Sequence, residues 1–243
     1  MQHKSPILFV MAIVAWAATA CATLSPPADT VLHFTEQERD GEPYATRMRV
    51  SKAYLRIDGG RAEAGADSGF VLLDRKAQTI YSVSPGDKTI LVIKPLPITL
   101  PRPEDYTLSV ERDKEALPQV GGKPVVHYRL LAGQETCAEV YAAAGLLPHV
   151  VDALREYHEI LAGEQAQSEM HALKAERSPC NLAEFVFAPA RHLDHGFPVR
   201  QVSHTGHARQ LVDYKLNAMP EEGWSTLPPN YRHYSIADMV PRR

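Results

Sequence analysis

The residues with the clearest chemical potential are four histidines in one short stretch. Of the 11 histidines in the chain, these four form His192-x-x-His195 and His204-x-x-His207. Thr205-Gly206 is typical of a two-residue hairpin turn, which would set His204 opposite His207 with Cβ atoms about 5 Å apart. Such a pair can share Zn²⁺ or Cu²⁺, and His192 or His195 would complete the ligands if the preceding loop folds over. The alternative is four solvated loop histidines.

Three cysteines, Cys21, Cys137 and Cys180, offer a second chemistry. Cys21 follows a cationic start and the apolar run Ile7–Ala20, which is shorter than the roughly 20 residues of a membrane span and is typical of an export signal. Cleavage before Cys21 would leave a lipid-carrying cysteine, as in bacterial lipoproteins. Ordinary cleavage after Ala20 or Ala22 also fits the small residues there.

Both lipidation of Cys21 and cleavage after Ala22 would leave Cys137 and Cys180 as a pair. In an oxidising compartment we expect them to form a disulfide, closing a loop of about 43 residues. The alternative is a redox or nucleophilic thiol, but the sequence has no Cys-x-x-Cys motif and no patterned histidine partner.

No catalytic constellation stands out elsewhere. The carboxylates follow no pattern, so the sequence predicts no enzyme and no cofactor, while an uncharacterised hydrolase stays an alternative. With 44% hydrophobic and 23% charged residues the chain is typical of a globular protein, and its formal charge of −3 argues against nucleic-acid binding.

The elements that must position these residues are mostly strands. Alternating apolar and polar residues and tight turns predict strands at Thr30–Glu38, Tyr44–Val50, Ala53–Asp58, Phe70–Asp74, Thr79–Ser84, Thr89–Lys94, Tyr106–Arg112, Val125–Leu131, Thr136–Ala142, Ala183–Ala188, Pro198–His204 and His207–Asn217. The region after Pro220 reads as an irregular tail, and Trp224, Leu227, Tyr231, Tyr234 and Ile236 give it enough apolar mass to dock on the sheet.

A helical period interrupts the strands. Val150, Leu154, Tyr157 and Leu161 mark one apolar helical face, and a second, more polar helical stretch runs from Glu164 to Arg177. We therefore expect an α+β, mainly β fold: a curved antiparallel sheet, or half-barrel, with a helical insertion near 149–177. Residues 1–20 would be the signal peptide, 21–29 a tether, and 30–243 a single domain.

Several short motifs resemble a family of exported bacterial proteins of unknown function. They are Ala53–Asp58, the segment Ile80–Pro85, Val120–Pro124 with Tyr128, Cys137–Tyr141, and Leu227–Tyr231. The sheet pattern is similar to that of periplasmic lipoprotein-carrier and lipoprotein-receptor half-barrels. The resemblance implies a curved sheet wrapped around helices and holding acyl chains, and it carries no catalytic residues.

The sequence thus favours a non-catalytic cell-envelope protein with a structural, interaction or hydrophobic-ligand-binding role. A lipidated chain would lie at the periplasmic face of the outer membrane, and an unlipidated one in the soluble periplasm; no protein partner can be named. A metal-binding periplasmic protein remains the alternative. The candidate cavity liners are Met48, Val50, Leu55, Ile57, Phe70, Leu72, Tyr81 and Val83, which could equally form a packed core.

Overall fold

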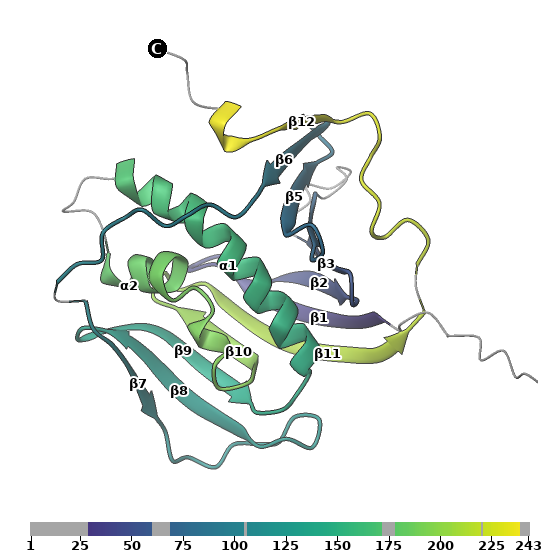
Figure 1. Cartoon of the computed structure of the whole chain (residues 1–243). Helices are drawn as coiled ribbons and strands as arrows, with labels where there is room; N and C mark the ends of the chain where they lie inside the picture. The colour runs from purple at the N-terminus through teal and green to yellow at the C-terminus, as the bar shows by residue number, and fades with distance from the viewer. Residues whose placement is uncertain (1–28, 60–68, 105, 172–177, 220, 239–243) are drawn as a thin grey trace, which may run out of the picture.

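A single twelve-stranded sheet organises the part of the chain that this computed structural model describes, which is residues 29–59, 69–104, 106–171, 178–219 and 221–238. The strands lie in the order β12-β6-β5-β4-β3-β2-β1-β11-β10-β9-β8-β7 (Figure 1). Their bounds are β1 Asp29–Gln37, β2 Tyr44–Val50, β3 Tyr54–Gly59, β4 Phe70–Asp74, β5 Thr79–Ser84, β6 Thr89–Ile93, β7 Leu108–Arg112, β8 Val125–Ala132, β9 Glu135–Ala143, β10 Phe197–Ser203, β11 Ala208–Ala218 and β12 Arg232–Tyr234.

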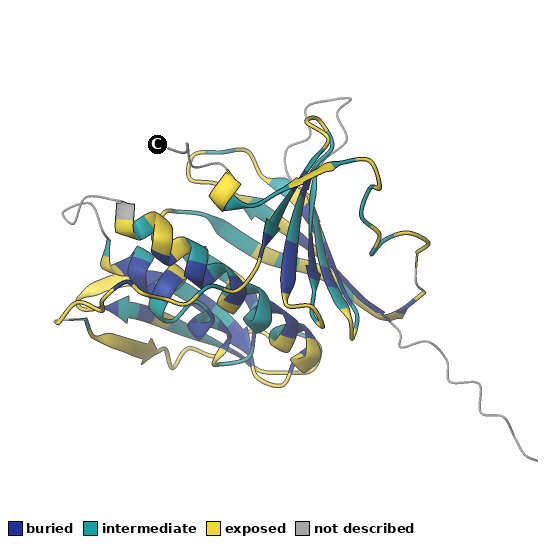
Figure 2. Ribbon diagram, turned by 45° about the horizontal axis from the view of Figure 1, so that its top comes forward, coloured by how far each residue is buried: buried dark blue, intermediate teal, exposed yellow. Residues whose placement is uncertain are grey.

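The sheet is curved and unclosed, and α1 (Pro148–His171) lies in its concavity (Figures 1 and 2). This confirms the expected α+β, mainly β half-barrel. The strands pair antiparallel with one exception among the described residues, because β12 runs parallel to β6. The tail after Pro220, expected to be irregular, thus adds an edge strand and makes the sheet mixed.

Strict alternation along the strands builds the core. Val50 pairs with Leu55, Leu55 with Leu73, Leu73 with Ile80, and Ile80 with Ile93, so one row of apolar side chains crosses five strands on the concave face. All five are buried. Because side chains alternate between faces, this row and its neighbours face α1 while the residues between them face outward.

Helix α1 covers this row with the residues that the sequence pattern selects. Val150 and Leu154 are buried, and Tyr157 and Leu161 pack against the same core. The helix continues through Gly163 to His171, so the expected separate second stretch is in fact the same helix as far as it is described. The backbone at Leu96 passes so close to α1 that only glycine fits at position 163. A Cβ there would lie 2.3 Å from the Leu96 carbonyl oxygen.

The strand expected at Ala183–Ala188 is wrong. The chain there forms a short helix, α2 (Pro179–Asn181), followed by a π-helical turn, η2 (Leu182–Phe187), and a 3₁₀ turn, η3 (Arg191–Leu193). Ser178 caps the start by accepting a hydrogen bond from the Cys180 backbone, and Pro179 suits the first helical turn. The buried residues Leu182, Ala183 and Val186 lie on one helical face. The alternating positions of Phe185 and Phe187 had instead indicated a strand.

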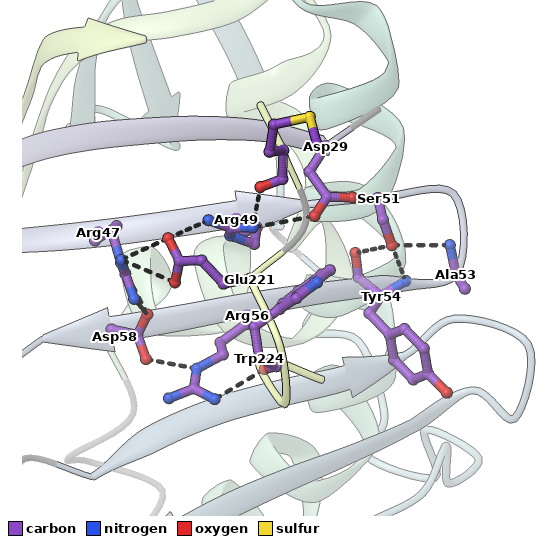
Figure 3. A network of polar contacts seen from close by, with 11 residues as sticks. Asp29, Arg47, Arg49, Ser51, Ala53, Tyr54, Arg56, Asp58, Glu221 and Trp224 are labelled. Carbon is purple, nitrogen blue, oxygen red and sulfur yellow. Dashed lines mark hydrogen bonds and ion pairs between the residues drawn. The ribbon is translucent and has the colours of Figure 1, made fainter. Parts of the chain in front are cut away.

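An ion-pair network on the outer face of the sheet joins the start of β1 to the chain that follows β11 (Figure 3). Arg49 of β2 contacts Asp29 at the start of β1 and Glu221 in the tail, and it donates to the Met219 carbonyl. Arg56 of β3 donates to the carbonyl of Trp224 at 2.8 Å. The tail is therefore docked on the sheet, as expected from its apolar residues.

The predicted signal peptide, Cys21 and the predicted tether before Asp29 lie outside the described residues. Among the helices that the structure describes, none has the length and apolar character needed to cross a membrane. The remaining strands agree with the expected ranges within two residues at either end, because their turns are rich in Gly, Pro and Asp.

Candidate functional site

The four histidines of the predicted metal site lie apart. His192 packs edge-on against His158 of α1 with ring centroids 4.8 Å apart, whereas His195 stacks on Tyr128 of β8 at 4.0 Å. His204 contacts Glu184 and Asn181, and His207 contacts Glu36. Within the described ranges, no group of three or more His, Cys, Asp or Glu side chains could hold a metal ion.

The hairpin explains why His204 and His207 do not pair. Val202 lies opposite Ala208, and the Ser203 backbone donates to the His207 carbonyl at 2.9 Å, so the loop has three residues rather than two. His204 therefore lies in the loop, and it is Ser203 that faces His207. The predicted cross-strand pair is wrong by one position of register, which is enough to separate the two rings.

The expected disulfide is present. Cys137 of β9 and Cys180 of α2 are bonded, and both are fully buried. The bond fixes the start of the α2–η3 segment, residues 179–193, to the sheet. This segment is the one that closes the pocket described next.

A pocket of about 300 Å³ lies between α1, the α2–η3 segment and strands β1, β8, β10 and β11. We call it the helix–sheet pocket. Its walls are mainly apolar and are contributed by Phe34, Leu130, Leu154, Phe185, Phe197 and Pro198, among others. The volume falls at the lower end of the roughly 300–1,000 Å³ that is usual for small-molecule sites.

None of the eight expected cavity liners borders this pocket. Met48, Val50 and Leu55 are buried in the packed core, with Ile57 against it. Phe70, Leu72, Tyr81 and Val83 lie on the opposite face of the sheet, because Leu72 pairs with both Arg56 and Tyr81. Met48, Val50, Leu55 and Ile57 therefore belong to the packed core, as the alternative interpretation expected. The other four residues are also apolar, so the sequence pattern did not reveal that they lie on the opposite face.

Arg209 of β11 is the main cation in the pocket. Its guanidinium carbon lies 4.0 Å from the ring centre of Phe34, and its Nε is 3.3 Å from Oε1 of Glu36. That contact is too poorly aligned to be a hydrogen bond. Among the described residues, Nε and Nη2 of Arg209 are buried without a hydrogen-bond acceptor.

Two histidines beside Arg209 are held neutral. Burial, with a smaller contribution from the Arg209 charge, lowers the pKa of His158 to about 4. Burial also holds the pKa of His192 well below its usual value, assisted by His158 and Arg209. At any pH near neutrality the pair therefore adds no charge to the pocket.

Two acid–histidine contacts border the pocket. Burial works against the charge of Glu36, but hydrogen bonds from His207 and Thr46 and the charge of Arg209 keep its pKa lowered, while the bond to Glu36 raises the pKa of His207. Glu184 differs, since burial raises its pKa to about 7 despite nearby Arg191. Glu184 accepts from or donates to His204 at 3.1 Å, depending on the proton position.

Arg191 occupies the Glu184 side of the pocket and is only 9% exposed. Its Nη1 donates to the Leu131 carbonyl at 3.0 Å, while Nε and Nη2 are buried without an acceptor in the described part of the chain. Oε1 of Glu184 likewise has no partner there. The pocket therefore combines apolar walls with several buried polar groups whose hydrogen-bonding capacity is unused.

The sequence held a signal for these residues. Arg209 precedes Leu211 by two positions in a strand, and His158 follows Leu154 by four positions on a helix, so both are polar residues in line with core positions. A buried polar residue is more informative than a buried apolar one. The sequence pattern did not indicate that η2 and η3 pack over Arg209 and His158.

The chain bears a weak likeness to known proteins. No family model matches the sequence, and no curated protein matches it. Among solved structures, an uncharacterized conserved protein from Thermus thermophilus is 10% identical with a TM-score of 0.44, over 86% of this chain and 91% of that one. PNGF-II is 8% identical with a TM-score of 0.44, over 87% of this chain but only 32% of its own.

A putative outer membrane lipoprotein-sorting protein domain from Vibrio parahaemolyticus is 9% identical with a TM-score of 0.33, over 82% of this chain and 89% of that one. All three TM-scores are below 0.5, so no functional conclusion follows from them. The resemblance to an exported family of unknown function stays a prediction.

Proposed function

We propose that this protein is a non-catalytic component of the bacterial cell envelope that binds the apolar part of a small ligand in the helix–sheet pocket. The observation that carries the proposal is the cavity of about 300 Å³ with mainly apolar walls beneath α1 and the α2–η3 segment. An apolar cavity of this kind is the default ligand site of a protein without a catalytic constellation.

Two further features support this proposal. The buried Cys137–Cys180 disulfide is suited to an oxidising compartment outside the cytoplasm. The only serine hydroxyl bordering the pocket, that of Ser203, hydrogen-bonds Thr205 at 2.6 Å rather than a histidine, so it has no base to activate it in the described residues.

Attachment of this protein to the membrane would depend on Cys21. We propose that it carries the lipid anchor and that residues 22–28 tether the domain to the outer membrane. The intact protein released from membranes by detergent should then have a mass higher by acyl groups, and a Cys21→Ala variant should be recovered from the soluble periplasm. An unmodified Cys21, or a mature chain that begins after it, would refute the anchor but not the pocket.

A neutral apolar fluorophore, N-phenyl-1-naphthylamine, tests the pocket. Its direct-excitation emission should rise and saturate on titration with the protein. Leu154→Trp, which enlarges a buried side chain at the wall, should weaken binding at least tenfold because it fills the cavity. Asp152→Trp is the matched control, since Asp152 is exposed on the same helix.

The control variant should bind the probe like the wild type, and both variants should keep a cooperative thermal transition. A wild-type protein that binds no probe would leave only a structural or interaction role. Equal weakening by both variants would place the binding somewhere other than the pocket.

A further inference from the structure

The helix–sheet pocket has a cationic side that its own residues do not satisfy. Arg209 packs against Phe34, and its buried Nε and Nη2 have no hydrogen-bond acceptor among the described residues. A buried donor left without a partner costs about 1–3 kcal/mol. The pocket therefore favours any occupant that brings an acceptor to this position.

The nearby carboxylate, Glu36, cannot meet that demand. Its Oε1 accepts a hydrogen bond from Thr46 at 2.7 Å, and its Oε2 contacts His207 at 3.0 Å. Its contact with Arg209 is the poorly aligned approach of 3.3 Å. Glu36 thus offsets part of the charge of Arg209 without accepting a hydrogen bond from its Nε or Nη2.

The overall charge of the lining also favours an anion. Arg191 and Arg209 are the fixed cations, the pKa of His207 is raised by its bond to Glu36, and Glu184 is only partly ionised because its pKa is raised to about 7. Two carboxylates oppose these cations from the rim: Glu36, whose pKa is lowered, contacts Arg209 and His207, and Glu38 lies 4.0 Å from His207. His158 and His192 stay neutral and can still donate or accept hydrogen bonds.

The apolar walls are placed to hold a chain beside this charge. Phe34 lies under the guanidinium of Arg209 and approaches Phe197 with ring centroids 6.5 Å apart, and Leu154 closes the cavity from α1. A cavity of about 300 Å³ suits one short chain rather than two. The site thus places the guanidinium of Arg209 at the border of a small apolar space.

Resting on the ligand-binding role above, we propose that the ligand is a single-chain anionic amphiphile whose oxyanion headgroup is bound inside the pocket by Arg209, with its chain against Phe34, Leu154 and Phe197. The headgroup accepts hydrogen bonds from Nε and Nη2 of Arg209. Its chain replaces water along the apolar walls.

Three probes with the same chain and different headgroups test the proposal: decanoate, decanol and decyltrimethylammonium. Titration calorimetry, below the micelle concentrations of the ionic probes and the solubility limit of decanol, should show decanoate binding at least tenfold more tightly than decanol, and the cation more weakly than either. Decyl phosphate serves as a fourth probe. Tighter binding of decyl phosphate would place the natural headgroup among phosphates, and tighter binding of decanoate would place it among carboxylates.

Arg209→Met keeps the length of the side chain and removes its charge. It should weaken decanoate at least tenfold and leave decanol unchanged. Arg200→Met is the matched control, because Arg200 is exposed on β10 and faces Tyr141 outside the pocket. If Arg209→Met does not fold, Arg209→Lys keeps the charge with fewer donors and should give an intermediate affinity for decanoate.

The outcomes separate this inference from the function on which it rests. Equal affinities for decanoate and decanol, unchanged by Arg209→Met, would overturn the anionic headgroup while leaving an apolar ligand in the pocket. Failure of all four probes to bind would overturn both the anionic headgroup and the ligand-binding role of the pocket.

Discussion

His158 and His192 show how burial changes the chemistry of single residues. Their rings meet edge-on between α1 and η3, with Arg209 beside them, and both are held in the neutral form. The histidine cluster read from the sequence is in this way divided among different partners: one ring joins this pair, one stacks on Tyr128, and two meet carboxylates. Histidine spacing indicated polar chemistry near the hairpin but could not give its partners, because His158 lies far away in the sequence.

The neutral state of His158 predicts how stability depends on pH. Since the pKa is about 4 in the folded protein and near 6.5 in the unfolded chain, the unfolded state binds more protons between these values, and stability falls as the pH drops from 6.5 to 4. This residue accounts for up to about 3 kcal/mol of that loss. The charged or titratable groups near it are Arg209 and His192, with Tyr157 adjacent in α1.

Urea unfolding of His158→Phe at a series of pH values checks this. As the pH drops from 6.5 to 4, the free energy of unfolding should fall more for the wild type than for His158→Phe. His233→Phe, at an exposed position of β12, is the matched control and should follow the wild type. A His158→Phe curve parallel to the wild type would show that the ring is charged or solvated in the folded protein.

At the scale of elements, patterned strands were predictable and the segment over the pocket was not. Three strands, Tyr44–Val50, Phe70–Asp74 and Thr79–Ser84, begin and end at the expected residues, because alternation and turn residues are local signals. The α2–η3 segment has no such signal. Its helical turns depend on the Ser178 cap, on burial against Ala166 and Leu100, and on the disulfide.

The disulfide should therefore stabilise this segment and the pocket together. Closing a loop of 43 residues contributes about 4 kcal/mol in the chain-entropy model, and measured values often fall below it. We expect Cys137→Ala/Cys180→Ala to lower the free energy of unfolding by about 3–4 kcal/mol and to weaken probe binding. Chemical denaturation with both readouts measures this.

Wild-type protein reduced by dithiothreitol is the control and should match the double variant. An unchanged midpoint in both samples would mean that the segment is held by its packing alone.

For the whole molecule, one buried cation, Arg49, connects the start of β1 and the beginning of the tail to β2. The Arg49 side chain is 3% exposed and contacts Asp29, Glu221 and the Met219 carbonyl (Figure 3). Burial raises the pKa of Asp29, and the Arg49 charge opposes this rise. The sequence predicted that the tail docks, from its aromatic residues, but not that an arginine in a distant strand would anchor it.

Removing that cation leaves Asp29 buried without its partner. We expect Arg49→Met to lower the free energy of unfolding by about 3–5 kcal/mol. Arg47→Met is the matched control on the same strand; because Arg47 is partly exposed, its loss should cost less than about 1 kcal/mol. Differential scanning calorimetry of both variants measures the difference, and equal small losses would show that the network does not stabilise the fold.

The position of a bound apolar molecule shows directly whether the helix–sheet pocket is the ligand site. In a methyl-labelled sample saturated with N-phenyl-1-naphthylamine, nuclear Overhauser effects should connect the probe to the methyl groups of Leu130 and Leu154, which border the pocket. They should be absent for Val212 and Leu216, which are exposed on β11. Contacts to Val212 and Leu216 with none to Leu130 and Leu154 would show that the probe binds on the outside of the sheet and not in the helix–sheet pocket.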